Sequence, residues 1–520
     1  MMNQAWDSYT SVLQGLICEL KQSISTAISN SVTETNTNES IGGETTSRTM
    51  SITETERHAR LAITKQTSRL QNGDFVVFIK QVIPDKIGDH LLGKSIEWKL
   101  PIRNCITKEH TLAVFLNRKA AFQHGIRDVL QAGEKYSMSA QGKAGVALVN
   151  AHAADGSANL TQLREMLLCL HVQRLLHANG YDVHMCGDTV IPQLHSMFGS
   201  SPQGSDNSAV EVKQDSREKL LNVAVEASPF KLKNEPQHST ESTDTLQPLA
   251  LSAQEFIKQE GLLTGGQHYS KNLDILTVKQ GQTWTPAFHE VIRLDSQQNL
   301  LNNKDVAVVV HVASAEKQYY QQQVDILWRM LCEISVPQVH LTHASVTCQK
   351  GRGLAKSTTA SDLIKLRTEQ MKEAYVVKYG DVVKGAEWDD TIQVAASAIV
   401  KFEMLSTSSN TSVKLDLLQT GGLIGSKGGA FVLYNYARLS TLFQHHEEDV
   451  EAGYYPALPD FEDVDTSLLV EEEEWSLLFN YILPFPTLVK DCVGEFHANS
   501  PHANIYTHKI CIIPSKHLEN

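Results

Sequence analysis

A strand–helix–strand segment in the first third of the chain constrains its fold more than any other feature. The apolar run "GVALVN" at 145–150 is typical of a buried strand, and "YDV" at 181–183 begins another. Between them, Asn159 and Gln162 have the spacing of a helix capping box, and Gly180 stands where a left-handed helix end belongs. This order predicts one unit of a doubly wound parallel sheet.

The same alternation continues along the chain. The helix has an apolar face at helical spacing, formed by Leu160, Leu163, Leu167 and Leu170. Strands and helices alternate as far as about residue 405, and "VAVVVHV" at 306–312 is a β-branched run of the kind that buried parallel strands require. From 428 onward the pattern is helical, with a long acidic connection. We therefore expect an α/β fold with a helical C-terminal part.

Composition narrows the class of protein. The chain has 520 residues, 41% of them hydrophobic, which suits two to four domains with sizeable cores. No apolar run reaches transmembrane length, and the first twenty residues lack the basic start and cleavage site of a signal peptide. They predict a short amphipathic or disordered leader. The eight cysteines are scattered without a C-x-x-C pair, so we interpret them as packing residues of a cytoplasmic protein without a metal site.

Charge is distributed unevenly. Residues 57–143 hold fifteen Lys and Arg against seven Asp and Glu, a net charge of +8, whereas the rest of the chain carries −21. A basic module on an acidic chain indicates either a polyanionic partner or a solvated basic surface. The connection 447–474 holds twelve acidic residues and no Lys or Arg. It is either a solvated loop or a surface for a basic partner protein.

Polar segments separate the ordered regions. Residues 26–56 and 196–250 are rich in Ser, Thr, Asn and Glu, a composition that predicts disorder. The expected regions are a mostly disordered leader (1–56), a basic N-terminal domain (57–140), an α/β domain with a disordered insert at 196–250 (141–425) and a partial helical bundle (426–520).

The central helix also resembles the first nucleotide-binding crossover of arginyl-tRNA synthetases, over "VNAHAADGSANLTQLREMLLCLHVQRLLHANGYDV". In that family the helix starts with His-x-Gly-His-Leu-Arg, and Leu163 and Arg164 match the Leu-Arg. Asn159 and Gln162 occupy the two histidine positions, and Thr161 occupies the glycine position. Because an amide cannot carry the positive charge that stabilises phosphate in the transition state, the resemblance implies a degenerate synthetase without catalytic residues or a cofactor.

The second catalytic loop of that family is altered as well. The family has a Lys-x-Ser-Lys-Ser-like or Lys-x-Arg-Ser-Gly-like loop, and the corresponding stretch here is "CQKGRGLAKSTTASDL". It contains Lys350, Arg352 and Lys356, but not in the family's order or spacing. We interpret it as a flexible basic loop in which Lys356-Ser357 is a partial match.

The likeness covers most of the chain. "HTLAVFLNRKAAFQHGIRDVL" resembles the end of the N-terminal additional domain of arginyl-tRNA synthetases, which contacts tRNA in that family. "IVKFEMLST", "GAFVLYNYARLSTLF" and "EEEWSLLFNYILPFP" resemble, in the same order, synthetase-like DALR anticodon-binding proteins that lack synthetase motifs. The resemblance implies a doubly wound class I synthetase-like nucleotide-binding fold, an N-terminal α+β additional domain and a C-terminal all-α DALR-type bundle, which we expect to be incomplete.

Two groups of residues are candidates for tRNA binding. The candidates are Arg118, Lys119 and Arg127 in the basic domain, and Tyr434, Tyr436 and Arg438 in the bundle helix. An exposed Tyr–Arg pair could stack on bases of the anticodon loop. The alternative is that both tyrosines are core or interdomain residues.

The resemblance also implies a function. A protein of this kind recognises arginine tRNAs and presents them to a tRNA methyltransferase, which forms 3-methylcytidine in the anticodon loop. Its expected partners are arginine tRNA and that methyltransferase, and neither DNA nor a membrane. Two alternatives stay open: an active arginine–tRNA ligase with unusual motifs, and a protein scaffold that no longer binds RNA.

Overall fold

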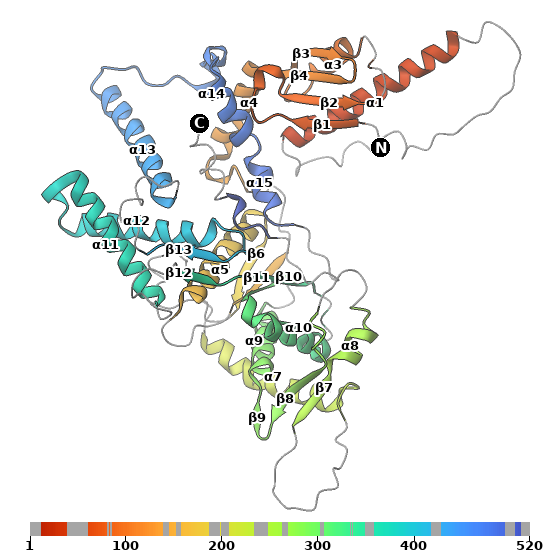
Figure 1. Cartoon of the computed structure of the whole chain (residues 1–520), viewed down its shortest axis with the longest axis vertical. Coiled ribbons are helices and arrows are strands. Elements are labelled where there is room, and N and C mark those ends of the chain that lie inside the picture. Colours follow the sequence, from red (N-terminus) through yellow and green to blue (C-terminus); the bar gives the residue numbers. More distant parts are fainter. Residues whose placement is uncertain are drawn as a thin grey trace, which may run out of the picture. The chain divides into compact units, whose positions relative to one another are not determined.

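The chain forms two compact units (Figure 1). The first unit comprises Met1–Ala140 and Tyr455–Leu488, and the second comprises Gln141–Tyr454 and Val489–Asn520. The computed structural model describes residues 12–38, 61–80, 83, 86–138, 145–151, 158–186, 198, 207–232, 248–262, 269–301, 306–332, 334, 336–348, 358–417, 428–494 and 505–510.

In the described residues before 140, the first unit contains an antiparallel sheet and the helices that pack on it. The strands are β1 (Leu61–Lys65), β2 (Phe75–Ile79), β3 (Ile102–Lys108) and β4 (Thr111–Leu116), in the order β1-β2-β4-β3. The helices are α1 (Val12–Asn38), α3 (Ile87–Ser95) and α4 (Arg118–Ala132), with the short helices η1 (Leu70–Asn72) and η2 (Gly133–Lys135). Phe75, Val77 and Ile79 alternate along β2 and are buried, as expected of a strand with one face on a core.

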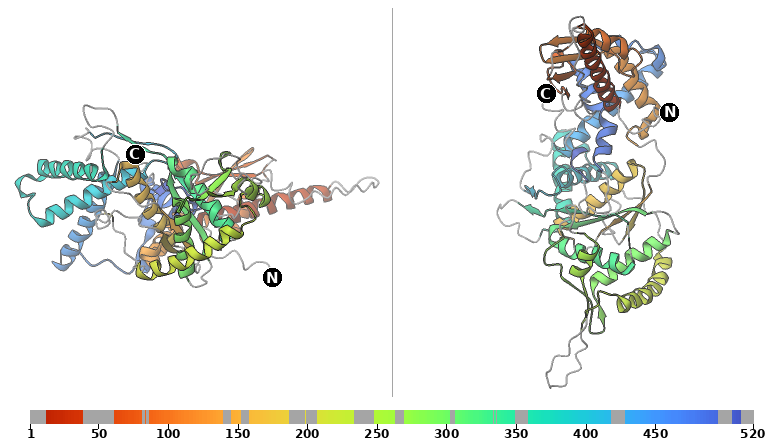
Figure 2. Two further views of the ribbon diagram at one scale, coloured as in Figure 1. Left: turned by 90° about the horizontal axis from the view of Figure 1, so that it is seen from below. Right: turned by 90° about the vertical axis from the view of Figure 1, so that its right-hand side faces the viewer.

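Helix α1 corrects the expectation that residues 1–56 are mostly disordered. Leu13, Leu16, Leu20 and Ile24 are all buried in the core of the first unit. Their spacing of three or four residues places them on one face of a helix. The helix contacts α3 and β1, and Figure 2 shows it from two further sides. The part of the leader at 1–11 and 39–56 lies outside the described residues.

The returning segment 455–488, expected in the C-terminal bundle, instead completes the core of the first unit. It contains η5 (Phe461–Asp463), η6 (Thr466–Leu468), α14 (Glu472–Leu477), the π-helical turn η7 (Leu478–Ile482) and the start of α15 (Phe485–Asp491). Trp475 is fully buried and stacks on Phe479, with ring centroids 5.2 Å apart. The indole N–H of Trp475 donates to Asp74 Oδ1 at 2.8 Å, while Asp74 Oδ2 accepts from Leu116 N at 2.7 Å.

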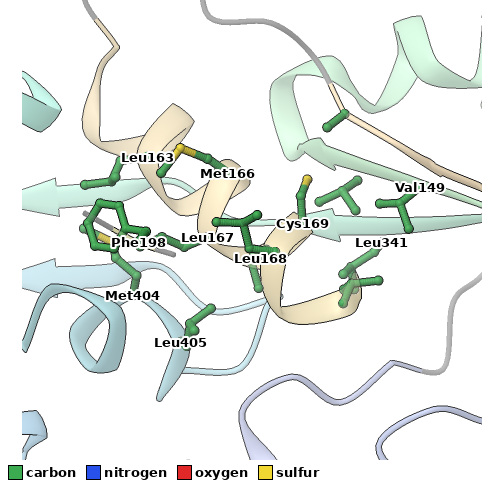
Figure 3. Close-up of a cluster of buried hydrophobic side chains, with 14 of the residues drawn as sticks. Val149, Leu163, Met166, Leu167, Leu168, Cys169, Phe198, Leu341, Met404 and Leu405 are labelled. Carbon is green, nitrogen blue, oxygen red and sulfur yellow. The ribbon is translucent and has the colours of Figure 1, made fainter. Parts of the chain in front are cut away.

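A parallel sheet forms the centre of the second unit, as the sequence predicts. The strands are β5 (Val146–Asn150), β6 (Asp182–Cys186), β10 (Val306–Ser314) and β11 (Gln338–His343), in the order β11-β10-β5-β6. One face packs on α5 (Leu160–Ala178); the other packs on α9 (Pro286–Leu300) and α10 (Gln318–Cys332). Phe198 and Met404 lie beside Leu167 of α5 in the first of these cores (Figure 3).

Smaller elements surround this sheet. Part of the insert at 196–250 is ordered, contrary to expectation. Helix α7 (Asn207–Ala227) buries Leu221 and Val225 in the same core as α9 and α10. An antiparallel sheet of β7 (Leu249–Ser252), β8 (Ile275–Gln280) and β9 (Thr283–Trp284) follows. The remaining elements are α8 (Ala253–Gln259), η3 (Ala315–Lys317), β12 (Val346–Cys348), α11 (Ala360–Tyr379), η4 (Gly380–Val382), α12 (Ala386–Leu405), β13 (Val413–Leu415) and α13 (Gly429–Glu451).

Arg164 of α5 links this helix to the residue after β11, to the end of α12 and to the segment that follows α12. Its guanidinium group donates to five backbone carbonyls, those of Ala344 (2.8 Å), Met404 (3.3 Å), Thr407 (3.2 Å), Ser408 (3.0 Å) and Thr411 (2.9 Å). Burial lowers the pKa of Arg164 to about 10, so the group remains charged near neutral pH. The Leu-Arg match in the sequence therefore marks a buried structural contact.

Replacing Arg164 with alanine should lower the free energy of unfolding by about 3 kcal/mol or more, because several buried carbonyls lose their donor. Urea unfolding of the full chain, followed by tryptophan fluorescence, measures the change. The Arg164→Lys variant keeps the charge but has fewer donors. Its free energy of unfolding should lie between those of the alanine variant and the unsubstituted protein. An alanine variant as stable as the unsubstituted protein would contradict this role.

Candidate functional site

The start of α5 is closed by its own side chains. Asn159 Oδ1 accepts from Gln162 N at 2.9 Å, and Gln162 Oε1 accepts from Asn159 N at 2.9 Å, which confirms the capping box. Thr161 Oγ1 accepts from Val346 N of β12 at 3.2 Å. A helix N-terminus binds phosphate through free backbone N–H groups, and here Asn159 already occupies the Gln162 N–H. The three degenerate motif residues lie together and maintain structure.

The start of α11 lies against the same turn and is capped in the same way. Asp362 N donates to Thr359 Oγ1 at 3.2 Å, and Thr359 N donates to Asp362 Oδ2 at 2.9 Å. Thr359 pairs with Asn159 in an isolated bridge, and Ala360 N donates to Ala158 O at 2.8 Å. The basic loop that contains Lys350, Arg352 and Lys356 lies outside the described residues.

A row of polar side chains crosses the parallel sheet, from the last residue of β5 to positions inside β10 and β11. Asn150 of β5, His311 of β10 and His340 of β11 share one register position. His311 Nδ1 lies 3.1 Å from Asn150 Nδ2 and 2.7 Å from Gln321 Nε2, both amide donors. His311 Nδ1 therefore accepts, and Nε2 donates to Gln338 Oε1 at 2.9 Å. Burial, together with the neighbouring His340, lowers the pKa of His311 to about 4.

Charged groups from α9 and α10 cover this row. Glu290 accepts from Asn150 Nδ2 at 2.7 Å and from the Tyr320 hydroxyl at 2.8 Å. Asp325 lies 2.6 Å from Arg329 Nε and 2.9 Å from His340 Nε2. Burial alone would raise the pKa of Asp325, but Arg329 and His340 hold it well below the usual range of a carboxyl group. Most polar groups of this row thus bind one another, whereas Gln321 Oε1 and Gln338 Nε2 are buried without a hydrogen-bond partner among the described residues.

No sequence motif predicted the polar row. A usable signal was present, because each of the runs "VALVN", "VAVVVHV" and "QVHLTH" carries an Asn or His beside apolar residues. The parallel register that aligns these residues becomes visible only in the structure.

The basic candidates on α4 are brought together, but all three are ion-paired. Arg118 Nη1 lies 2.7 Å from Glu472 Oε1, and Lys119 Nζ lies 3.2 Å from Asp465 Oδ1. Arg127 makes a bidentate pair with Glu462, with N–O distances of 2.8 and 2.6 Å. These carboxylates belong to the acidic connection, which thus has a basic partner within its own chain.

Helix α13 exposes its aromatic candidates. The exposed fraction is 47% for Tyr434 and 72% for Tyr436, and Arg438 is exposed as well. The alternative of two core tyrosines is therefore wrong. Lys378 Nζ of α11 lies 5.4 Å from the ring centroid of Tyr434 and adds a positive charge beside it.

The described residues also bear on two other classes of site. In that part of the chain, no group of three or more His, Cys, Asp or Glu side chains could hold a metal ion. None of the helices described there is long and apolar enough to cross a membrane. The cysteines of the described segments are free thiols.

Comparison with known proteins places the chain in a family. No protein-family model matches the sequence. The chain is 30% identical to DALR anticodon-binding domain-containing protein 3 of Danio rerio over 436 residues, covering 79% of this chain and 74% of that protein. The Mus musculus protein of the same name is 30% identical over 439 residues, covering 79% and 75%. The chain belongs to the DALR anticodon-binding domain-containing protein 3 family.

The fold of this family member is that of an arginyl-tRNA synthetase. The solved structure of Thermus thermophilus arginyl-tRNA synthetase matches it with a TM-score of 0.50 and 12% sequence identity, covering 89% of this chain and 94% of the other. The expected class I synthetase-like α/β fold is confirmed.

The buried His311 of this family member should make its stability depend on pH. Folded His311 binds a proton only below about pH 4, whereas the unfolded side chain binds one below about pH 6.5. Acidification therefore protonates the unfolded state first and should cost about 2 kcal/mol of stability between pH 7.5 and pH 5. Urea unfolding at both pH values measures this loss.

The neutral variant His311→Asn serves as the comparison, because it cannot take up the proton. Its stability should fall less between the two pH values than that of the unsubstituted protein. Equal losses in both proteins would show that His311 does not cause the effect.

Proposed function

We propose that this protein binds tRNA without aminoacylating it. In its finer form, the proposal is a cytoplasmic adaptor that recognises arginine tRNAs and presents them to a tRNA methyltransferase for 3-methylcytidine formation in the anticodon loop. The name of its relatives refers to an anticodon-binding domain, which supports tRNA as the ligand. The arginine tRNAs and the methyltransferase rest on the sequence resemblance alone.

The observation that carries the non-catalytic part is the closed start of α5. The two positions at which arginyl-tRNA synthetases have histidines hold amides that hydrogen-bond each other's backbone. Preorganised groups that stabilise a developing charge are each worth about 3–4 kcal/mol of barrier. Amides that cap a helix carry no positive charge, and their hydrogen bonds keep them from moving with a phosphate group.

Purified protein should therefore show no arginine-dependent exchange between ATP and pyrophosphate above background. The assay detects the adenylate step without requiring tRNA transfer, although it is run with and without arginine tRNA. An authentic arginyl-tRNA synthetase serves as the positive control. Exchange at a rate comparable to that control would favour the ligase alternative.

Helix α13 supplies the best-exposed candidate contacts for RNA. Tyr434 presents its ring to solvent beside Lys378, and Tyr436 and Arg438 of the same helix are exposed as well. Unpaired loop bases stack on aromatic rings of this kind, and each stacked base is worth about 1–3 kcal/mol.

The double variant Tyr434→Ala with Tyr436→Ala should weaken binding of an arginine tRNA by about tenfold or more, because two stacking platforms are lost. Fluorescence anisotropy with labelled tRNA measures the dissociation constant. The matched control replaces Tyr454 and Tyr506, two exposed tyrosines outside α13, with alanine. Equal weakening in the two double variants would contradict a specific role of α13.

One observation favours a second candidate, the scaffold that does not bind RNA. The cations of α4 that were expected to hold tRNA are already paired with carboxylates. Isolation of the full chain from cells without nuclease tests this alternative. Recovery of the methyltransferase without any tRNA would support the scaffold.

A further inference from the structure

An acidic segment of the chain lies along the basic helix α4. We define the acidic strap as residues 460–472. Glu462, Asp465 and Glu472 follow one another along the strap, and their partners Arg127, Lys119 and Arg118 follow in the reverse order along α4. The strap therefore runs antiparallel to α4. Helix α14 begins at the end of the strap and packs beside α4 (Figure 1).

The backbone of the strap is anchored at its middle and beyond its end. Thr466 is buried, and its hydroxyl donates to the backbone carbonyl of Lys119 at 3.1 Å. Leu469 packs against the core of the first unit, and the buried Trp475 follows three residues after the strap. These contacts hold the strap over α4 independently of its charges.

The carboxylates, in contrast, face the solvent. The exposed side-chain fractions are 69% for Glu462, 53% for Asp465 and 52% for Glu472. Exposed ion pairs of this kind are individually weak. Glu462 and Glu472 can therefore turn into water while the strap backbone stays in place, which would free their cations for another anion. Asp465 Oδ1 also accepts from Ser467 N at 3.0 Å, so at this pair Lys119 is the group that moves.

The geometry of the pairs also suits phosphate. Arg127 binds Glu462 through two nearly parallel N–H···O contacts, which is the arrangement in which arginine binds phosphate oxygens. The negative charges of the returning segment and the excess positive charges of the basic domain are also similar in number. Residues 455–488 contain eight acidic and no basic residues, whereas 57–140 have an excess of seven positive charges. The strap thus presents to α4 a series of anions, as an RNA backbone does.

We propose that α4 carries a binding surface for the phosphate backbone of RNA and that the acidic strap covers this surface, so that RNA and the strap carboxylates compete for Arg118, Lys119 and Arg127. The proposal rests on the proposed function, in that the RNA would be tRNA. Because of this competition, an RNA that contacts the protein only through its phosphates binds more weakly. An RNA that also makes contacts elsewhere on the protein displaces the carboxylates more readily, so the strap acts as a selectivity device.

Two triple variants of the full chain test the competition. The paired triple is Glu462→Gln, Asp465→Asn and Glu472→Gln, which removes the three carboxylates that contact α4. The matched control is Asp460→Asn, Asp463→Asn and Glu473→Gln, which removes two charges from the strap and one from the residue directly after it, at residues without a described ion pair to α4. Both variants change the net charge equally, so long-range attraction of RNA rises equally in both.

Dissociation constants are measured for two probes, poly(U) as an RNA without specific structure and an arginine tRNA. The paired triple should bind poly(U) about tenfold more tightly than the matched control, because three competing carboxylates are absent. Equal affinities of the two triples would overturn the proposal, since net charge alone would then explain any gain. Weaker binding by the paired triple would overturn it too.

The two probes separate this proposal from the proposed function. If the paired triple gains on poly(U) but no protein prefers the arginine tRNA, the competition stands and tRNA recognition fails. If the unsubstituted protein prefers arginine tRNA and the two triple variants bind poly(U) equally, tRNA recognition stands and the competition fails. The single variant Glu462→Gln, at the most exposed of the three carboxylates, provides a version of the test that leaves the core untouched.

Discussion

The hydrogen bond between the buried Trp475 and Asp74 decides how the first unit is built. Asp74 loses its hydration inside the core, which raises the pKa of its carboxyl group, and in exchange it accepts from Trp475 Nε1 and Leu116 N. Because this contact joins positions 401 residues apart, the C-terminal part of the chain must return to the N-terminal sheet. The acidic strap precedes Trp475 directly and is thereby held over α4.

At three separate places, polar groups that could act on a ligand contact other groups of the same chain instead. At the start of α5, Asn159 and Gln162 cap one another's backbone. Across the middle of the parallel sheet, buried polar side chains around His311 hydrogen-bond one another. On α4, carboxylates of the same chain neutralise the cations. Helix α13 differs, because its tyrosines and arginine face the solvent.

Local patterns in the sequence predicted local structure well. The capping box at Asn159 and the left-handed Gly180, with φ of 89°, follow from short-range rules and are present. Contacts between distant positions could not be predicted in this way. Counting charges showed that residues 57–143 are basic, but the partners of Arg118 and Arg127 lie more than 330 residues further along the chain. The leader was misjudged because its polar second half obscured the apolar spacing of Leu13 to Ile24.

The reciprocal cap of α5 limits which substitutions the start of this helix can accept. Histidines at 159 and 162 would abolish the amide contacts that now start the helix. A lost cap of this kind typically costs about 1 kcal/mol. Thr161 would also have to give up its bond to Val346 N before a glycine could stand there. A mutational path from the present residues to the synthetase motif would therefore pass through less stable proteins at each step.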